Sequence, residues 1–264
     1  MNGGWWAQPR ARHGSSSRRL SGRRSETGAL ADGQILKVDP AFPTHARRLG
    51  GRVIAKELRH RLLSRTPSFG LRCDLGRLPP LKEAAVPLTL EPCLGVFGGF
   101  TAELGRTTGA DYGRALRRKR LHEMGLRTLH VAHNQGQEPV YVQWLVSAAD
   151  RPGLDAAGID YWPPLPANEV LLEFAYTFTP FRGMGAMGAG MGRLLRIAAD
   201  QGAMAAHTYV TFDNVPSLRG CAGVGFNLDH VRETTMLGGI RRGRVRAPTA
   251  AERAAWETAT APRS

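Results

Sequence analysis

The sequence predicts a protein of the α/β or α+β class, and three observations support this prediction. An aliphatic and aromatic run at 169–178 is too short for a helix and precedes a glycine-rich turn and apolar residues at helical spacing. Alternating runs within 129–146 flank an Asn-Gln-Gly turn, a pattern typical of a β-hairpin. A further alternating run at 206–212 leads into a short helical segment at 215–224.

The strand, glycine turn and helix between 169 and 202 predict an anion site. The turn carries Gly183, Gly185 and Gly188, and the helix is expected to end at Gln201-Gly202. The apolar stripe of this helix is Met187, Met191, Leu194, Leu195 and Ala198. Backbone without Cβ atoms turns tightly and points its N–H groups at whatever lies above the start of the helix, which carries a partial positive charge. A phosphate or pyrophosphate is therefore the expected ligand, and a glycine turn of purely structural use is the alternative.

Two familiar phosphate loops are set aside. Gly183, Gly185 and Gly188 have the spacing of the dinucleotide-binding fingerprint, but the next strand continues into Asp213-Asn214 and a helix, which does not complete the expected βαβ unit. No Gly-Lys-Ser/Thr follows the glycines, which excludes a nucleotide P-loop.

The turn resembles the central motif of the GNAT superfamily of N-acetyltransferases, Arg/Gln-x-x-Gly-x-Gly/Ala at a strand-to-helix turn. Arg182 and Gly185 match this motif, Gly183 is an extra glycine, and Met187 departs from the last position. GNAT chains also carry Asn-x-x-Ala/Ser after the next strand and Gly-Phe after the following helix. Asn214, Ser217, Gly225 and Phe226 occupy those positions. The resemblance covers about residues 85–246 and is nearest to an uncharacterised bacterial branch.

This resemblance implies a mixed, mostly antiparallel twisted sheet with helices on both faces. It also implies transfer of an acetyl group from acetyl-CoA, the cosubstrate, to a primary amine by direct attack in a ternary complex. The implied cofactor-binding residues are Tyr176, Thr177, Phe178, Thr179, Arg182, Gly183, Met184, Gly185, Ala186, Met187, Gly188, Asn214 and Ser217. For Asn214 a helix cap is an alternative role, and the two roles are compatible.

Three residues are candidates for proton transfer. Glu173 lies among apolar residues in the strand, where burial should raise the pKa of a carboxylate toward the working range of a general base; a structural ion pair with an arginine is the alternative. Cys221 occupies the position where many GNAT relatives place a tyrosine acid, and buried packing is its alternative. Tyr176 is the other candidate acid. Aromatic residues that could line an acceptor cleft or pack in the core are Tyr141, Trp144, Tyr161 and Trp162.

Composition limits the partners. The chain has 264 residues and a formal net charge of +14, mostly from arginine, since lysine occurs only four times. This bias is typical of a GC-rich genome as well as of a binding surface, so nucleic acid is expected at most at the basic N-terminal tail. Cys73, Cys93 and Cys221 are widely spaced, which predicts reduced thiols in the cytoplasm and no metal site. No apolar run reaches the roughly 18 residues of a membrane span.

The expected organisation has four parts. They are a disordered basic tail at 1–34, an N-terminal extension with an amphipathic helix at 35–84, the acyltransferase domain at 85–246 and a C-terminal tail at 247–264. Smaller expected elements are a short strand at 69–74, a first core strand at 86–92, a helix at 110–124, a proline-rich loop at 148–168 and a last strand at 231–237. A protein that binds CoA or a partner without turnover is the second function class, and a homodimer is left open. The sequence does not identify the acceptor.

Overall fold

The computed structural model describes residues 63–126, 128–156, 164–237 and 240–261, together with residues 45, 48, 50, 51 and 55. The chain divides into two units, Met1–Lys37 and Val38–Ser264, and all described residues belong to the second. The predicted tail at 1–34, most of the predicted amphipathic helix, and Tyr161 and Trp162 lie outside the described residues.

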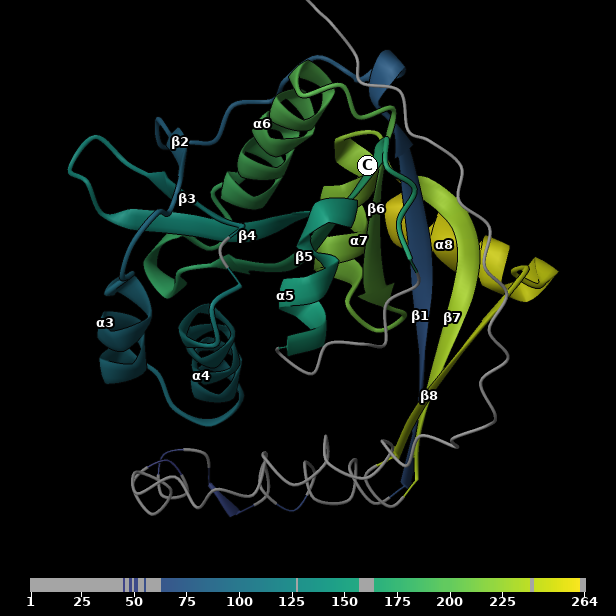
Figure 1. The fold of residues 1–264 in the computed structure, drawn as a ribbon, viewed down its shortest axis with the longest axis horizontal. Coiled ribbons are helices and arrows are strands. Elements are labelled where there is room, and N and C mark those ends of the chain that lie inside the picture. The colour runs from purple at the N-terminus through teal and green to yellow at the C-terminus, as the bar shows by residue number, and fades with distance from the viewer. Residues whose placement is uncertain are drawn as a thin grey trace, which may run out of the picture. The chain divides into compact units, whose positions relative to one another are not determined.

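The described strands form one eight-stranded sheet in the order β2-β3-β4-β5-β6-β1-β7-β8 (Figure 1). The strands are β1 Leu63–Asp74, β2 Thr89–Pro92, β3 Leu129–His133, β4 Pro139–Ser147, β5 Glu169–Thr177, β6 Ala205–Thr211, β7 Asn227–Leu237 and β8 Ile240–Arg246. Only β5 and β6 pair in parallel, and every other neighbouring pair is antiparallel. The predicted mixed, mostly antiparallel sheet is confirmed.

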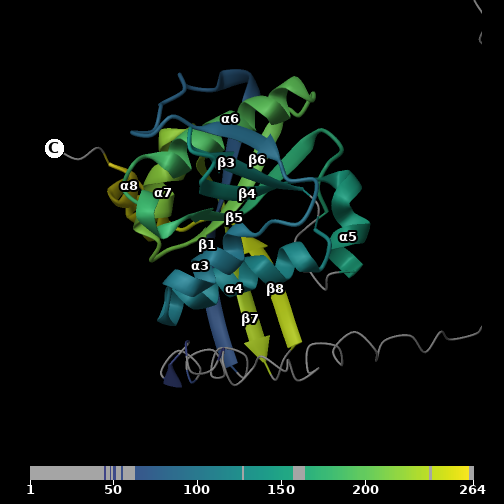
Figure 2. The same ribbon diagram turned by 90° about the vertical axis from the view of Figure 1, so that its left-hand side faces the viewer.

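Helices cover both faces of the sheet, as predicted (Figure 2). Their bounds are α3 Gly99–Arg106, α4 Gly109–Glu123, α5 Arg151–Ala156, α6 Ala186–Asp200, α7 Val215–Gly223 and α8 Ala250–Thr260. Helices α6, α7 and α8 share a buried cluster with β1, β5 and β6, whereas α3, α4 and α5 share one with β3, β4 and β5. Among the described helices, none combines the length and the apolar character needed to cross a bilayer.

Helix α6 forms where its apolar stripe predicts it. Met191, Leu194, Leu195 and Ala198 are almost completely buried against the sheet, while Met187 at the first turn is only partly covered. The helix ends at a turn in which Gly202 has a φ of 89°, a left-handed conformation that favours glycine.

Strand β1 is longer and more central than the short strand expected at 69–74. Phe69, Leu71 and Cys73 alternate into the core, and β1 pairs with β6 on one side and β7 on the other. Pro67 interrupts the alternating pattern, so the first half of the strand was not predicted. Pro67 lies where β1 pairs only with β7, and its missing N–H therefore breaks no hydrogen bond to β6. Because β1 and β2 belong to one sheet, that sheet extends across the expected boundary at residues 84 and 85.

The C-terminal segment expected as a tail at 247–264 contains helix α8. Thr249 and Glu252 form a reciprocal capping box at its start, and the Trp256 side chain packs into the core with its ring centroid 6.0 Å from that of Phe69. Apart from Trp256, this helix contains only alanine, charged residues and threonine, so it gives little periodic signal and the sequence pattern did not predict it. Strand β8 and helices α3 and α5 were also not predicted.

Replacing Trp256 with alanine should lower the free energy of unfolding by about 3 kcal/mol, since it removes a large aromatic side chain that closes the core. Urea unfolding of the full chain measures this. Glu257→Ala is the matched control, because Glu257 is exposed on the same helix. Equal stabilities of the two variants would contradict the assignment of α8 to the core.

Candidate functional site

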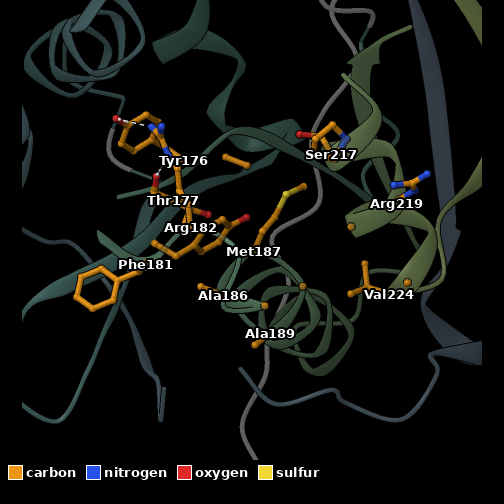
Figure 3. Close-up of a pocket in the computed structure, with 18 of the residues that line it drawn as sticks. Tyr176, Thr177, Phe181, Arg182, Ala186, Met187, Ala189, Ser217, Arg219 and Val224 are labelled. Atoms are coloured by element: carbon orange, nitrogen blue, oxygen red, sulfur yellow. Dashed lines mark hydrogen bonds between the residues drawn. The ribbon is translucent and has the colours of Figure 1, made fainter. Parts of the chain in front are cut away.

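The sheet opens between its two parallel strands. Strands β5 and β6 pair only through Glu169–Leu171 and Ala205–His207, although β5 continues to Thr177 and β6 to Thr211. A cleft of about 980 Å³ lies beyond the last paired residues and is lined by the ends of β5 and β6, the glycine loop and the first turns of α6 and α7. Figure 3 shows Tyr176, Thr177 and Arg182 on one side, Ser217 and Arg219 on the other, and Met187 between them.

A bulge in β5 brings two backbone carbonyls within reach of a side chain of α4. The register slips between Val142 and Trp144 of β4, and Phe174 in the bulge has a φ of 58°, which is unfavourable for a residue with a Cβ atom. Arg118 of α4 holds this conformation, because its Nε donates to the Phe174 carbonyl at 2.8 Å and its Nη2 to the Ala175 carbonyl at 2.7 Å. Burial lowers the pKa of Arg118 to about 10, so the guanidinium is charged at neutral pH.

Glu173 lies where the two strands separate. Its Oε1 accepts the backbone N–H of Tyr209 at 2.8 Å, so the side chain replaces a hydrogen bond that the separating strands no longer make. Burial raises the pKa of Glu173 to about 7, while this hydrogen bond and the charges of Arg232 and Arg118 lower it by less. Glu173 is not among the residues that line the cleft. The pKa of Glu173 suits a general base at neutral pH, but its side chain does not itself line the cleft.

The glycine loop presents the start of α6 to the cleft. Gly183 and Gly185 have φ values of 79° and 76°, and Gly185 is the N-cap residue of α6, where no side chain caps the helix. The first-turn residues Ala186, Met187 and Gly188 line the cleft. The unpaired N–H groups and partial positive charge of a fifteen-residue helix therefore meet the open space, as an anion site requires.

Further positive side chains line the same cleft. Lys82, Arg114 and Arg219 also line the cleft, together with the two acids Glu83 and Asp213. None of the three cations was predicted, because each lies on a different element and only folding brings them to one rim.

Arg182, predicted to bind the cofactor, is held by a partner from α4. Its Nη1 and Nη2 each lie 3.0 Å from a carboxylate oxygen of Asp111, and its Nε donates to the Thr177 carbonyl at 3.2 Å. The hydrogen bond between them lowers the pKa of Asp111 and raises that of Arg182. Arg182 thus fixes the loop against the end of β5.

Glu103 is a buried carboxylate that the sequence analysis missed. It is completely buried, and its Oε1 accepts from the Tyr176 hydroxyl at 2.8 Å and from the Thr179 N–H and hydroxyl at 3.1 and 2.7 Å. Burial, followed by the hydrogen bond to Glu103, raises the pKa of Tyr176 to about 12. Tyr176 lines the cleft, but such a phenol is a poor proton donor to a thiolate.

The structure brings most of the predicted cofactor-binding residues to the cleft. The lining residues among them are Tyr176, Thr177, Arg182, Gly183, Gly185, Ala186, Met187, Gly188, Asn214 and Ser217. The other three predicted residues do not line the cleft. Phe178 is buried in the core, Thr179 is hydrogen-bonded to Glu103, and Met184 is exposed. Asn214 is the N-cap residue of α7, but its side chain makes no capping hydrogen bond and lines the cleft instead.

Cys221, a predicted acid, lies in the core beneath α7. Its side chain is completely buried, it does not line the cleft, and burial raises the pKa of its thiol. This placement corresponds to the packing alternative. Trp144 is likewise buried, with its indole N–H donating to the Leu126 carbonyl at 3.0 Å, whereas Tyr141 forms part of the cleft floor. Among the described residues, no three His, Cys, Asp or Glu side chains gather in a way that could hold a metal ion.

Comparison with known proteins gives likeness of structure only. No protein-family model and no curated protein matches the chain. A GNAT-family acetyltransferase from Colwellia psychrerythraea matches with a TM-score of 0.44 and 13% identity, over 70% of this chain and 60% of that one. A GCN5-related N-acetyltransferase from Sphaerobacter thermophilus matches with a TM-score of 0.41 and 13% identity, over 73% of this chain and 59% of that one.

A third match is the GCN5-related glucosamine N-acetyltransferase region of a fungal multi-domain β-N-acetylglucosaminidase. Its TM-score is 0.47 and its identity 11%, over 72% of this chain and 22% of that one. The chain thus spans less than two thirds of the length of each of these three structures. With identities and TM-scores of this size, neither activity nor substrate follows from these likenesses.

Replacing Arg118 with methionine should lower the free energy of unfolding by about 2 kcal/mol or more, because two carbonyls of the bulge lose their hydrogen-bond donor. Methionine retains most of the aliphatic stem, so the lost hydrogen bonds dominate the effect. Denaturant unfolding measures this, with Arg117→Met as the control at the exposed neighbouring position. A loss no greater than that of the control would mean that the bulge holds its conformation without Arg118.

Proposed function

We propose that this protein is an acyl-CoA-dependent N-acyltransferase of the GNAT type, which transfers an acetyl group from acetyl-CoA to a primary amine. The observation that carries the proposal is the cleft between the separating ends of β5 and β6, with an uncapped helix start at its mouth. Its volume of about 980 Å³ suits a large, elongated ligand with an anionic part.

In the proposed complex the pyrophosphate of acetyl-CoA lies over the first turn of α6. The N–H groups of Ala186 to Gly188 donate to the pyrophosphate. Positive charge around the remaining phosphate group of acetyl-CoA comes from Lys82, Arg114 and Arg219, which line the cleft. The pantetheine arm enters the gap between the strands, where Tyr176 and Thr177 of β5 no longer pair with β6 and the Asn214 side chain offers an amide. These groups bind and orient the thioester.

The proposed transfer needs a general base but no covalent intermediate with the protein. The amine nitrogen attacks the thioester carbon, the C–S bond breaks, and the ammonium proton passes to Glu173 through a water molecule. With a pKa of about 7, Glu173 accepts this proton at neutral pH and can release it again. The departing thiolate takes its proton from water, because the pKa of Tyr176 is raised to about 12 and Cys221 lies in the core.

Two measurements test the proposal in sequence. Acetyl-CoA should raise the melting temperature of the protein, because a ligand that binds only the folded state stabilises it. Free thiol should then appear when acetyl-CoA and a panel of amines are mixed with the protein. No thermal shift would overturn the proposal. A shift without thiol release from any amine would leave a CoA-binding protein without turnover.

Gly188→Ala should weaken acetyl-CoA binding without harming the fold, and Gly188→Leu should weaken it further. A Cβ atom at Gly188 would meet no other atom of the protein within 4 Å, and Gly188 lines the cleft, so the added group is expected to obstruct a bound ligand and nothing else. Alanine should also stabilise the helix by up to about 1 kcal/mol. Calorimetric titration with acetyl-CoA measures the affinity.

The matched control for Gly188 is Gly105→Ala. Gly105 lies in α3, where a Cβ atom would also meet open space, but away from the cleft. Gly185 is unsuitable, because its φ of 76° would strain any side chain. Unchanged acetyl-CoA affinity in both Gly188 variants would place the pyrophosphate elsewhere.

Glu173→Gln should reduce the rate of acyl transfer by ~10²–10⁴-fold while acetyl-CoA affinity stays nearly unchanged. Only the ionised carboxylate accepts a proton. With a pKa of about 7, the wild-type rate should therefore fall as the pH drops below 7. This fall in rate at low pH, the acid limb of the profile, should be absent in the Gln variant. The measurement is the rate of acyl transfer as a function of pH. A structural Glu173 would instead lower the melting temperature, reduce activity only in proportion to folded protein and leave the acid limb in place.

A further inference from the structure

Strand β8 lies at one end of the sheet, and no described strand pairs with its outer edge. On its inner side β8 pairs with β7 along its whole length, from Ile240 opposite Leu237 to Arg246 opposite Val231. In Figure 2, β7 and β8 extend below the labelled helices. Alternate backbone N–H and C=O groups of β8 point away from β7, so the edge offers the hydrogen-bonding groups of an extended chain.

This edge is strongly basic. The seven residues of β8 include four arginines and no acid. Arg242, Arg244 and Arg246 alternate, so their side chains share one face of the strand, at a spacing of about 7 Å. Arg246 is opposite Val231, which belongs to the same buried cluster as Trp256, so this is the face of the sheet that α8 covers.

The acids beside β8 are already used by two other arginines. Glu233 is directly opposite Arg244, but its Oε2 lies 2.5 Å from Arg65 and its Oε1 accepts from Arg246 Nε at 3.0 Å. Both oxygens of Glu252 accept from Arg246, at 2.6 and 2.7 Å. Arg242 and Arg244 are exposed, and among the described residues neither has a carboxylate partner. Two guanidinium groups on the edge are therefore available to an outside anion.

Two other occupants of the edge fit it less well. A second copy of β8, paired antiparallel over the full strand, would place Arg242 of one copy opposite Arg244 of the other, and like charges in that position are destabilising. Single-stranded nucleic acid is bound largely by stacking of bases on aromatic rings, and β8 contains no aromatic residue. Nucleic acid also has no regular use for the alternating donors and acceptors of a strand edge.

We propose that the outer edge of β8 binds an acidic peptide segment in an extended conformation, which adds to the sheet as a further strand. Backbone pairing would supply affinity, and acidic side chains at alternate positions would lie beside Arg242 and Arg244. The opposite face of β8 carries Gly243 and Val245, and Val245 is 52% exposed, so the intervening peptide residues are expected to be apolar. No residue of β8 lines the cleft, so this docking surface is independent of the proposed acyl transfer.

Fluorescence anisotropy with the full chain tests this proposal. The probe is a labelled, end-blocked peptide of sequence Thr-Glu-Val-Glu-Val-Glu-Thr. A second peptide has the same sequence with N-methyl groups on two adjacent central residues, which prevents strand pairing along either of its edges without changing its charge. The wild type should bind the second peptide at least about tenfold more weakly, because backbone hydrogen bonds are lost.

The double variant Arg242→Glu/Arg244→Glu should bind the acidic peptide at least about tenfold more weakly than the wild type, because repulsion replaces two attractive contacts. It should instead bind Thr-Lys-Val-Lys-Val-Lys-Thr more tightly than the wild type does, a gain that a failure to fold does not produce. The matched control is Arg77→Glu/Arg106→Glu, which makes the same change of charge at two exposed arginines on other elements. This control should bind the acidic peptide like the wild type.

Three results would overturn the proposal. Equal affinity for the N-methylated peptide would exclude strand addition. Undiminished binding of the acidic peptide by Arg242→Glu/Arg244→Glu would place the peptide elsewhere on the molecule. Tighter binding of a twelve-nucleotide oligothymidylate than of the peptide, lost in the same double variant, would assign the β8 edge to nucleic acid.

Discussion

The separation of β5 from β6 is the constraint on which the rest of the site depends. Two strands that separate leave backbone donors and acceptors without partners, and buried groups of this kind are costly. Here side chains supply the missing partners. Glu173 accepts from the Tyr209 N–H, Arg118 donates to the carbonyls of Phe174 and Ala175, and Glu103 accepts from Thr179. The gap can therefore stay open without a ligand to fill it.

The side chains that replace these backbone partners also set the electrostatics of the gap. Glu173 and Arg118 are ionisable side chains placed where backbone would otherwise be, and burial shifts their pKa values toward the neutral form, up for Glu173 and down for Arg118. Arg118 remains charged because its pKa starts so high, whereas the pKa of Glu173 reaches neutral pH. An open strand pair thus produces, as a physical consequence, one carboxylate able to exchange a proton near pH 7.

The local part of this site could be predicted from the sequence, and the long-range part could not. The strand, glycine turn and helix at 169–202 are read from neighbouring residues, and Glu173 stands out as one carboxylate among apolar side chains. Glu103 and Asp111 bond to residues more than seventy positions away, on helices whose place is set by folding. Cys221 shows the converse error: its sequence position matches a motif, but its side chain turns into the core. Strand β1 was underestimated because a proline interrupts its alternation, and α8 because one tryptophan carries its packing.

The glycines of α6 separate the requirements of the fold from those of a ligand. Gly190 has a structural reason, since a Cβ atom there would lie 2.4 Å from the Tyr141 ring and push the helix off β4. Gly185 has another, since its φ of 76° is left-handed. Gly188 has neither: its surroundings are open, its conformation is helical, and alanine there would make a better helix. The proposed function supplies a reason for glycine at this cleft-lining position, namely the close approach of the bound cosubstrate. An open first turn with N–H groups directed at the cleft is what the proposed binding of an anionic ligand requires.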